Sequence, residues 1–383
     1  MPCRDDAGRC RSGNTDAEHR PRLETFCPSP QGDRLNPETD DPEMTVADSE
    51  TLNPISIGLD DGYAFTKIAL PDGRLIAIPS RARIGHSNVT WLNGSEQRVF
   101  EYETDDTLFA VGEVDGEPTH FDGYPFSGLN RAIVQHALHE AGLAGQSVHA
   151  VSGLPVSSFY RKHGDQRLEL IERKRASLKQ AVQPVDGRLP AAIAFHEVIP
   201  EALAAWYDHI ISEAKGGVQL EAERLGVPVA VIDIGGRTTD FVVVADQAVR
   251  HDSSGSLRCG LLDLKRQVAA AIRAKFDLEE LSERATDDAV RSGSVRLFGK
   301  THDVAEVVRD ARRELVQRLH AETQRQLGRG AELERILFVG GGAVALAENI
   351  RDWFPNQTIA PHPAFANARG MLKYLRYVCQ EPT

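Results

Sequence analysis

The sequence has few of the features that mark secreted, membrane-bound or nucleic-acid-binding proteins. Its five cysteines, at positions 3, 10, 27, 259 and 379, form no Cys-x-x-Cys pair, which is typical of a protein kept in a reducing cytosol. No run approaches the roughly 18 apolar residues that span a membrane, and the N-terminus lacks the apolar core of a secretory signal. We therefore expect a cytoplasmic protein with no membrane partner.

Positive charge is also scarce. The chain has 44 Lys and Arg residues against 56 Asp and Glu, a net charge of −12, and residues 1–50 hold twelve acidic and six basic side chains, half of that excess. Because binding to a phosphate backbone requires a surplus of basic side chains, direct DNA binding is not expected. With 383 residues, 41% of them hydrophobic, the chain is long enough for two domains or one large bilobal unit.

Residues 1–52 are rich in Pro, Asp, Arg, Gly and Ser and poor in large apolar side chains. Such a composition cannot repay the entropy of ordering, so we expect a disordered tail. Met44 is a candidate for the true start of the protein, because the structured pattern begins only after it. The three cysteines of this tail match no common zinc spacing, and we expect them to be solvated thiols.

One short pattern occurs twice, as DDGYAFTK at residues 60–67 and as DIGGRTTD at residues 233–240. Each copy lies between two apolar runs. When the copies are aligned on their first aspartates, further residues coincide: Asp60 with Asp233, Gly62 with Gly235 and Thr66 with Thr239. The offset of 173 residues is too long for a solenoid, so the repeat predicts two related domains.

Each copy predicts a strand, a tight glycine turn and a returning strand. A glycine turn lets neighbouring amides point at one anion, and an aspartate at the end of a strand can hold a metal ion through water. Two such hairpins facing each other would bind a nucleotide triphosphate and its Mg²⁺ from both sides.

Short β-rich runs alternate with amphipathic stretches along the rest of the chain. The first half predicts strands at 55–59, 65–70, 75–79, 98–101, 108–111, 148–151 and 191–195, and helices at 129–141 and from Pro200. The second half predicts a hairpin at 229–245, a strand at 335–339, and helices at 261–276, up to 327, from 340 to 354 and at 366–379. Strands alternating with helices imply α/β layers, and the duplication implies two like domains with a cleft between them.

The segment 168–182 contains the charged block Glu172-Arg173-Lys174-Arg175. It is either the solvated surface of an element, which is the more common meaning of such a run, or a partner-binding patch.

A third signal is the run LFVGGGA at residues 337–343, in which a strand leads into glycines at the start of a helix. Glycines there remove side chains, so a flat base or ribose can lie against the backbone. In this order, the three segments resemble the phosphate 1, phosphate 2 and adenosine motifs of the actin, sugar kinase and DnaK-type chaperone superfamily. The resemblance covers about residues 55–378. It implies an α/β, actin-like bilobal fold, with two duplicated RNase H-like domains and a nucleotide cleft between them.

Within this superfamily the sequence is most similar to the ParM/StbA plasmid-segregation actins. Segments that are not general to the superfamily carry this similarity, among them Gly153-Leu154-Pro155, the block at 171–175, Ile199-Pro200-Glu201 and residues 365–370 (FANARG). The similarity implies a first domain at 53–199, with an inserted subdomain at about 81–125 and completed by a helix at 365–383. A second domain would cover 200–364, with an inserted subdomain at about 262–330.

The resemblance also implies roles for single residues. Asp60 and Asp233 would hold Mg²⁺, mostly through water, and Glu201 would act with Asp233 in catalysis by activating the attacking water. Glu201 also has a structural explanation, because acidic residues are common in the first turn of a helix. The other nucleotide contacts would come from Asp61, Gly62, Tyr63, Lys67, Gly235, Gly236, Thr238, Gly340, Gly341 and Gly342, with Lys67 bridging the β- and γ-phosphates.

Two segments depart from the family pattern. Tyr63 and Ala64 replace a pair of small hydroxyl residues seen in some relatives, so the first loop would offer the phosphate backbone amides without a side-chain oxygen. Arg237 replaces a glycine, and it would either contact phosphate or point to solvent.

The resemblance implies an ATPase in which ATP closes the cleft and promotes head-to-tail filament growth, while hydrolysis weakens the polymer. A small DNA-bound adaptor protein at a plasmid centromere would connect the filament to DNA. Two alternatives stay open: a small-molecule kinase of the same superfold, and a nucleotide-binding scaffold without turnover.

Overall fold

The computed structural model describes residues 53–89, 92, 99–214 and 217–379. The expected tail at 1–52, with Met44 and its three cysteines, lies outside the described residues. Among the helices that are described, none is both long and apolar enough to cross a membrane.

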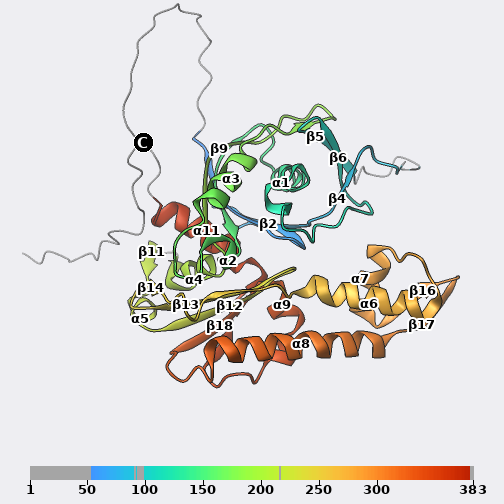
Figure 1. Cartoon of the computed structure of the whole chain (residues 1–383). Helices are drawn as coiled ribbons and strands as arrows, with labels where there is room; N and C mark the ends of the chain where they lie inside the picture. Colours follow the sequence, from blue (N-terminus) through green and yellow to red (C-terminus); the bar gives the residue numbers. More distant parts are fainter. Residues whose placement is uncertain (1–52, 90–91, 93–98, 215–216, 380–383) are drawn as a thin grey trace, which may run out of the picture. The chain divides into compact units, whose positions relative to one another are not determined.

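Two sheets with the same plan form the framework (Figure 1). In each, a central strand is antiparallel to one neighbour and parallel to the other. The first sheet has the order β3 (Leu75–Pro79), β2 (Phe65–Ala69), β1 (Ile55–Asp61), β7 (Ser147–Leu154) and β9 (Ala192–Pro200). The second has the order β14 (Ala248–Val249), β13 (Thr239–Ala245), β12 (Val229–Ile234), β18 (Arg335–Val339) and β19 (Gln357–Ile359), with β15 (Gly255–Leu257) beside β13. The predicted duplication of an α/β domain is therefore confirmed.

The central strands β1 and β12 are buried along most of their length, which explains why they read as apolar runs. Ile57 and Leu59 lie in the core of the first domain, and Ile232 and Ile234 lie in the core of the second. Because both strands end in aspartates at the same place in the plan, the fold itself brings these acidic residues to corresponding edges of the two sheets.

A small four-stranded sheet is inserted after β3. Its order is β4 (Ala82–Ile84), β6 (Thr107–Gly112), β5 (Val99–Thr104) and β8 (Gln183–Pro184). The helix α1 (Gly128–Glu140) packs on it, starting at the Ser127 cap and ending before Gly142, close to the predicted range 129–141. The contribution of β8 was not expected, because it comes from a segment about 70 residues beyond β6.

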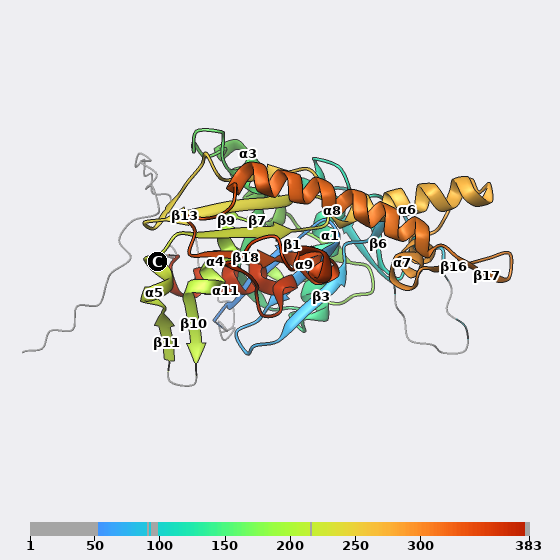
Figure 2. The same ribbon diagram turned by 90° about the horizontal axis from the view of Figure 1, so that it is seen from below.

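The second insertion contains α6 (Leu261–Phe276), α7 (Glu283–Ser292), β16 (Ser294–Leu297), β17 (Lys300–Asp303) and α8 (Ala305–Leu327). The bounds of α6 are those predicted, whereas the β16–β17 hairpin was not anticipated. Figures 1 and 2 show α8 running beside α6, with the hairpin at the far end of the insertion.

Two predicted helices differ from the structure. The helix expected to start at Pro200 is α4 (Leu203–Ile210), because β9 continues through Pro200 and the chain then turns at Glu201 and Ala202. The single helix expected from 340 to 354 is two short ones, α9 (Gly340–Ala345) and α10 (Ala347–Ile350), since Leu346 leaves helical geometry. The remaining elements are α2 (Val156–Phe159), α3 (Leu168–Leu178), β10 (Ile211–Ala214), β11 (Gly217–Leu220), α5 (Ala222–Leu225) and two single turns at Tyr124–Phe126 and Pro363–Phe365.

The last helix, α11 (Ala366–Tyr377), returns to the first sheet and packs on it through Met371 and Leu375. Conversely, α4 follows the first sheet in sequence but packs on the second, through Ala205 and Trp206. The two helices thus cross between the sheets (Figure 1). Gly370 makes the crossing possible, because any Cβ there would overlap the Ala204 carbonyl.

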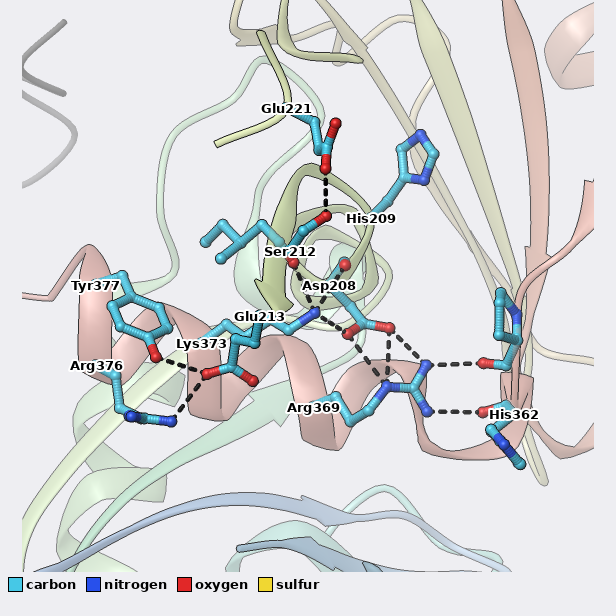
Figure 3. A network of polar contacts seen from close by, with 12 residues as sticks. Asp208, His209, Ser212, Glu213, Glu221, His362, Arg369, Lys373, Arg376 and Tyr377 are labelled. Carbon is cyan, nitrogen blue, oxygen red and sulfur yellow. Dashed lines mark hydrogen bonds and ion pairs between the residues drawn. The ribbon is translucent and has the colours of Figure 1, made fainter. Parts of the chain in front are cut away.

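Charged side chains fasten α11 to α4 and to β10 (Figure 3). Asp208 of α4 accepts from Arg369 Nη2 at 2.5 Å and from Lys373 Nζ at 2.7 Å. Glu213 of β10 accepts from Arg376 Nη1 at 2.8 Å and from the Tyr377 hydroxyl at 2.6 Å. The contacts run along successive turns of α11, so this helix is held in register on its neighbours.

Candidate functional site

The glycine turns of the two repeated hairpins face each other. The turn between β1 and β2 approaches the turn between β12 and β13 so closely that a Cβ on Gly236 would lie 2.7 Å from the Ala64 Cβ. A cavity of about 160 Å³ lies beside this contact. It is lined by Asp60, Gly62, Tyr63, Ala64, Phe65, Lys67, Glu201, Asp233, Gly235, Gly236, Thr238, Leu261, Leu262, Lys265, Gly340, Gly341 and Asn367.

Eleven of the thirteen residues predicted from the sequence line this cavity, and Asp61 and Gly342 do not. Successive side chains of a strand point to opposite faces, so Asp61 points away from the face that Asp60 occupies. Its carboxylate accepts from Asn130 Nδ2 at 2.9 Å and is paired with the fully buried Lys174. Gly342 packs against Ile234, where a Cβ would overlap the isoleucine side chain. Both residues therefore lie away from the cavity that the other eleven line.

The cavity gathers more negative charge than the protein neutralises. Burial, together with Asp60 and Asp240, raises the pKa of Asp233 to about 7. Burial also raises the pKa of Glu201 well above its usual range, with Asp240, Asp60 and Asp233 adding to the effect. Among the described residues, Lys67 is the one cation that contacts these carboxylates directly, with Nζ 2.6 Å from Asp60 Oδ2. Burial opposes the charge of Lys67, but the contact with Asp60 leaves the pKa of the lysine raised. Such a site favours an added cation.

These residues fit Mg²⁺ in a particular way. Over the described part of the chain, no three His, Cys, Asp or Glu side chains are arranged to enclose a metal ion. Mg²⁺, however, commonly keeps several waters and uses one or two carboxylates together with substrate phosphates. Asp60 and Asp233, both nearly buried at one cavity, suit that mode of binding through water.

Different elements hold the carbonyls of the two turns. In the first turn, the Ser80 hydroxyl donates to the Gly62 carbonyl at 2.6 Å. In the second, the first amides of α6 donate to the carbonyls of Gly235 and Gly236, at 3.1 and 2.8 Å. A trans peptide points its N–H away from its C=O, so the N–H groups of Gly236 and Arg237 lie opposite α6. In the described residues these two N–H groups donate to no protein acceptor, which leaves them available to an anion.

Two of the three glycines at the start of α9, Gly340 and Gly341, lie at the cavity and differ in what surrounds them. Gly340 has φ of +88° and faces the Asp233 carboxylate so closely that a side chain would displace it. Gly341 faces the cavity, and a Cβ placed on it would have no other atom within 4 Å. It is therefore the glycine against which a base or ribose could lie.

Two residues that matter at the site had no role assigned from the sequence. Asn367, near the start of α11, donates from Nδ2 to Asp233 Oδ2 at 2.7 Å and accepts from the Ala202 amide at 3.1 Å. Asp240 accepts from the Val156 amide at 2.7 Å and from the Ser256 hydroxyl. A usable signal for Asn367 was its position among the apolar residues of the helix, where a buried amide needs a partner.

Arg237 neither points to solvent nor lies in the cavity. Its guanidinium stacks over the Tyr63 ring at 5.2 Å, and Nη2 donates to Asp122 Oδ1 at 2.5 Å. Only 11% of the side chain is exposed. Because Tyr63 belongs to the first hairpin and Arg237 to the second, a residue from each departing segment contacts the other across the site.

The charged block at 172–175 lies on α3 and is largely engaged within the protein. Lys174 is buried against Asp61, Arg175 pairs with Glu172 and Glu197, and Arg173 stacks over Phe126 at 4.7 Å. The block therefore fastens α3 to the first domain, and Lys174 reaches the strand end that carries the first motif.

Comparison with known protein families agrees with this arrangement. Residues 55–211 match the family described as plasmid segregation protein ParM, N-terminal, and residues 231–352 match the family described as archaeal actin homologue MreB-like, C-terminal. The chain has an actin-like bilobal fold, and its residues 55–211 are similar to the ParM N-terminal family. The resemblance noted from the motifs is thereby confirmed.

The similarity to relatives and to solved structures extends over most of the chain. An archaeal actin homologue of Thermoplasma volcanium is 25% identical over 356 residues, covering 82% of this chain and 97% of that protein. A non-polymerisable mutant of the pCBH ParM has a TM-score of 0.68 at 19% identity, covering 85% of this chain and 99% of its own. A crystal structure of an archaeal actin homologue in complex with ADP has a TM-score of 0.65 at 22% identity, covering 84% and 99%. At these identities the structures establish the fold of this actin-like chain.

Proposed function

We propose that this protein is a cytoplasmic ATPase that assembles head-to-tail into filaments, and that it serves plasmid DNA segregation. The observation that supports this most is the pair of glycine turns from duplicated domains, facing each other beside a cavity with unneutralised carboxylates. The solved structures of similar fold include an ADP complex of an archaeal actin homologue and a 15-stranded ParM filament from Clostridium botulinum. The proposed domains are 53–199 with 365–383, and 200–364.

In this proposal the phosphates of ATP lie between the two turns. The amides of Gly236 and Arg237, with Thr238, donate to them, and Lys67 supplies positive charge next to Asp60. Asp60 and Asp233 hold Mg²⁺ through water, and the ion when bound neutralises charge on the phosphates. Gly341 supports the nucleoside.

Glu201 is placed to orient the attacking water. Its backbone is fixed in the turn after β9, where its N–H donates to the Leu154 carbonyl at 2.8 Å. Gly153 provides the space for its side chain, since a Cβ there would lie 2.8 Å from Glu201 Cγ. Glu201 directly precedes the N-cap residue of α4 and so lies outside the first turn of that helix. A carboxylate with a raised pKa is a better proton acceptor near neutral pH.

The size of the cavity implies movement. Sites for small molecules usually measure about 300–1,000 Å³, and 160 Å³ is less than that. The contacts of Gly236 with Ala64 and of Arg237 with Tyr63 must therefore separate when a nucleotide enters or leaves. Because the two turns belong to different domains, binding of a nucleotide changes the orientation of one domain relative to the other. Head-to-tail contacts that depend on this orientation build open filaments, whose assembly then depends on the bound nucleotide.

The direct test is Glu201→Ala with Glu172→Ala as the exposed control. With Glu201→Ala we expect ATP binding and light scattering by the polymer to persist while phosphate release falls at least about 100-fold, and with Glu172→Ala all three should stay normal. Unchanged phosphate release in Glu201→Ala would remove Glu201 from its role. A wild-type protein that stays dispersed with Mg-ATP would contradict filament formation and favour a small-molecule kinase.

We further propose that DNA is reached through a small DNA-bound adaptor protein. The support is the net charge of −12, which disfavours direct contact with a phosphate backbone. Electrophoretic mobility of duplex DNA should be unchanged by the purified protein at about physiological salt. A shift produced by the protein alone would contradict this part of the proposal.

A further inference from the structure

The amide side chain of Asn367 connects two parts of the site that lie at strand ends of different sheets. Its Nδ2 donates to Asp233 Oδ2 at 2.7 Å, and its Oδ1 accepts from the Ala202 amide at 3.1 Å. Asp233 is the penultimate residue of β12, the central strand of the second sheet, whereas Glu201 and Ala202 follow β9, an edge strand of the first sheet. We propose that Asn367 is a positioning residue that couples the metal-side carboxylate to the turn carrying Glu201. This inference rests on the proposed ATPase function.

An asparagine is suited to this double contact. Its amide offers both a donor and an acceptor on one rigid plane, and Asn367 uses one of each. The side chain is 5% exposed and lines the cavity, so water has little access to compete for either bond. A buried hydrogen bond to a carboxylate is among the stronger ones in proteins. Asn367 therefore holds Asp233 and the Ala202 amide at a defined distance from each other.

The Ala202 backbone is strained, which makes the second bond important. Ala202 has φ of 62° and ψ of −41°, a combination that non-glycine residues rarely adopt. Its N–H bond to Asn367 is one of the contacts that hold this conformation. The Ala202 N–H and the Glu201 carbonyl belong to one planar peptide unit, so the bond to Asn367 also restrains the backbone on the C-terminal side of Glu201.

The position of Asn367 is itself fixed by the helix that carries it. Further along this helix, Arg369 of α11 is bonded to Asp208 of α4, and Lys373 binds the same carboxylate (Figure 3). Gly370 lies directly on the Ala204 carbonyl. Since α4 begins at Leu203, these contacts keep the start of α11 at a constant distance from the Glu201 turn. Asn367 is thus a rigid spacer between Asp233 and Glu201.

Asn130 provides a matched control for this role. It is also a buried asparagine that donates to an aspartate at the end of a central strand, Asp61, at 2.9 Å. Asp61 does not line the cavity. Loss of either amide should weaken the fold, but only loss of Asn367 should affect the reaction.

The test compares Asn367→Ala with Asn130→Ala in two measurements. The first is hydrogen exchange of the Ala202 amide without nucleotide, which should become at least about tenfold faster in Asn367→Ala and stay unchanged in Asn130→Ala. The second is phosphate release at saturating Mg-ATP, where kcat should fall about 10–100-fold in Asn367→Ala with KM nearly unchanged, and stay within about twofold in Asn130→Ala. Normal kcat in Asn367→Ala would overturn the proposal, whatever its exchange rate.

A second variant separates the two bonds and keeps the size of the side chain. Asn367→Asp retains an acceptor for the Ala202 amide but replaces the neutral Nδ2 donor with an acidic group beside Asp233. We expect exchange at Ala202 to stay within about threefold of wild type and kcat to fall at least tenfold. A wild-type kcat in this variant would show that the Asp233 contact has no positioning role. Wild-type protein that releases no phosphate would overturn the proposed function itself, and the exchange comparison would still show whether Asn367 holds the turn.

Discussion

The two hairpins share a sequence pattern, yet they are held by different interactions. In the first, a lysine accompanies each aspartate: Lys67 binds Asp60 at 2.6 Å, and the buried Lys174 pairs with Asp61. In the second, Asp233 is held by a neutral amide, and Asp240 by a backbone N–H and a hydroxyl. The first hairpin is therefore compensated by the protein's own cations. In the second, no ion pair joins Asp233 to a lysine or arginine among the described residues, and burial raises its pKa to about 7. A ligand's cation should therefore have its larger electrostatic effect at the second hairpin, and the buried ion pair should have its larger effect on stability at the first.

The largest effect is expected from breaking the buried pair of the first hairpin. Lys174→Met leaves the Asp61 carboxylate buried without its cation, and removing one partner of a buried ion pair typically costs about 3–5 kcal/mol of unfolding free energy. Urea denaturation would measure the loss. The double variant Lys174→Met with Asp61→Leu should recover most of it, because no unpaired charge remains. A single variant as stable as wild type would mean that the pair does not fasten this hairpin.

Asp233→Ala removes the carboxylate of the second hairpin that is proposed to bind the cation of Mg-ATP. We expect Mg-ATP affinity to fall at least about tenfold, equal to about 1.4 kcal/mol or more, while stability without nucleotide stays the same or rises, because a buried charge is removed. Calorimetric titration and thermal unfolding would give both values. Unchanged Mg-ATP affinity would contradict the assignment of Asp233 to the cation.

The same contrast predicts a dependence on pH. The pKa of Asp233 is about 7 in the folded protein against an ordinary value of 3.8, so between these values the folded state binds more protons than the unfolded state. The contribution of Asp233 to stability must then fall as pH rises from about 4 to 7. When Tm is measured in EDTA at a series of pH values from about 4 to 7, it should decline less steeply with rising pH in Asp233→Asn than in the wild type. An equal slope in both proteins would be inconsistent with a raised pKa.

The smallest effect is expected at the contact between the hairpins. Arg237→Ala removes the stacking on Tyr63 and the bond to Asp122, worth about 0.5–2 kcal/mol, so release of a fluorescent nucleotide should accelerate by roughly 2- to 30-fold. Arg258→Ala is the control, since Arg258 also pairs with Asp122 but is 74% exposed and does not contact Tyr63. Equal release rates in the two variants would show that the stacked contact does not restrain the cleft.

Local patterns in the sequence were sufficient for much of the fold. The hairpins, α6 and β18 were located from features that act over a few residues: apolar runs, glycine turns and the helical period. The start of α4 was wrong because Pro200 suits both the first turn of a helix and the end of an edge strand, and β7 pairing decided for the strand. The β8 strand was missed because two residues carry no pattern of their own.

The site divides in the same way. The motif glycines and acids that line the cavity were found because each motif is contiguous in sequence. Asn367 lies 134 residues from Asp233, and Lys174 lies 113 residues from Asp61, so no spacing rule connects either pair. Asp61 was assigned to the nucleotide because it stands beside Asp60 in the motif, and the alternation of side chains along a strand separates them. Lys174 was counted with its charged neighbours on α3, although it alone is fully buried.

A crystal structure with Mg²⁺ and a non-hydrolysable ATP analogue is the most direct test of the central claim that both hairpins bind one triphosphate. The phosphates should lie between the turn at Gly62 and the turn at Gly235 and Gly236, with the cation next to Asp233 and the Gly236–Ala64 contact opened. A nucleotide bound to one hairpin alone, or outside the cavity, would contradict this account.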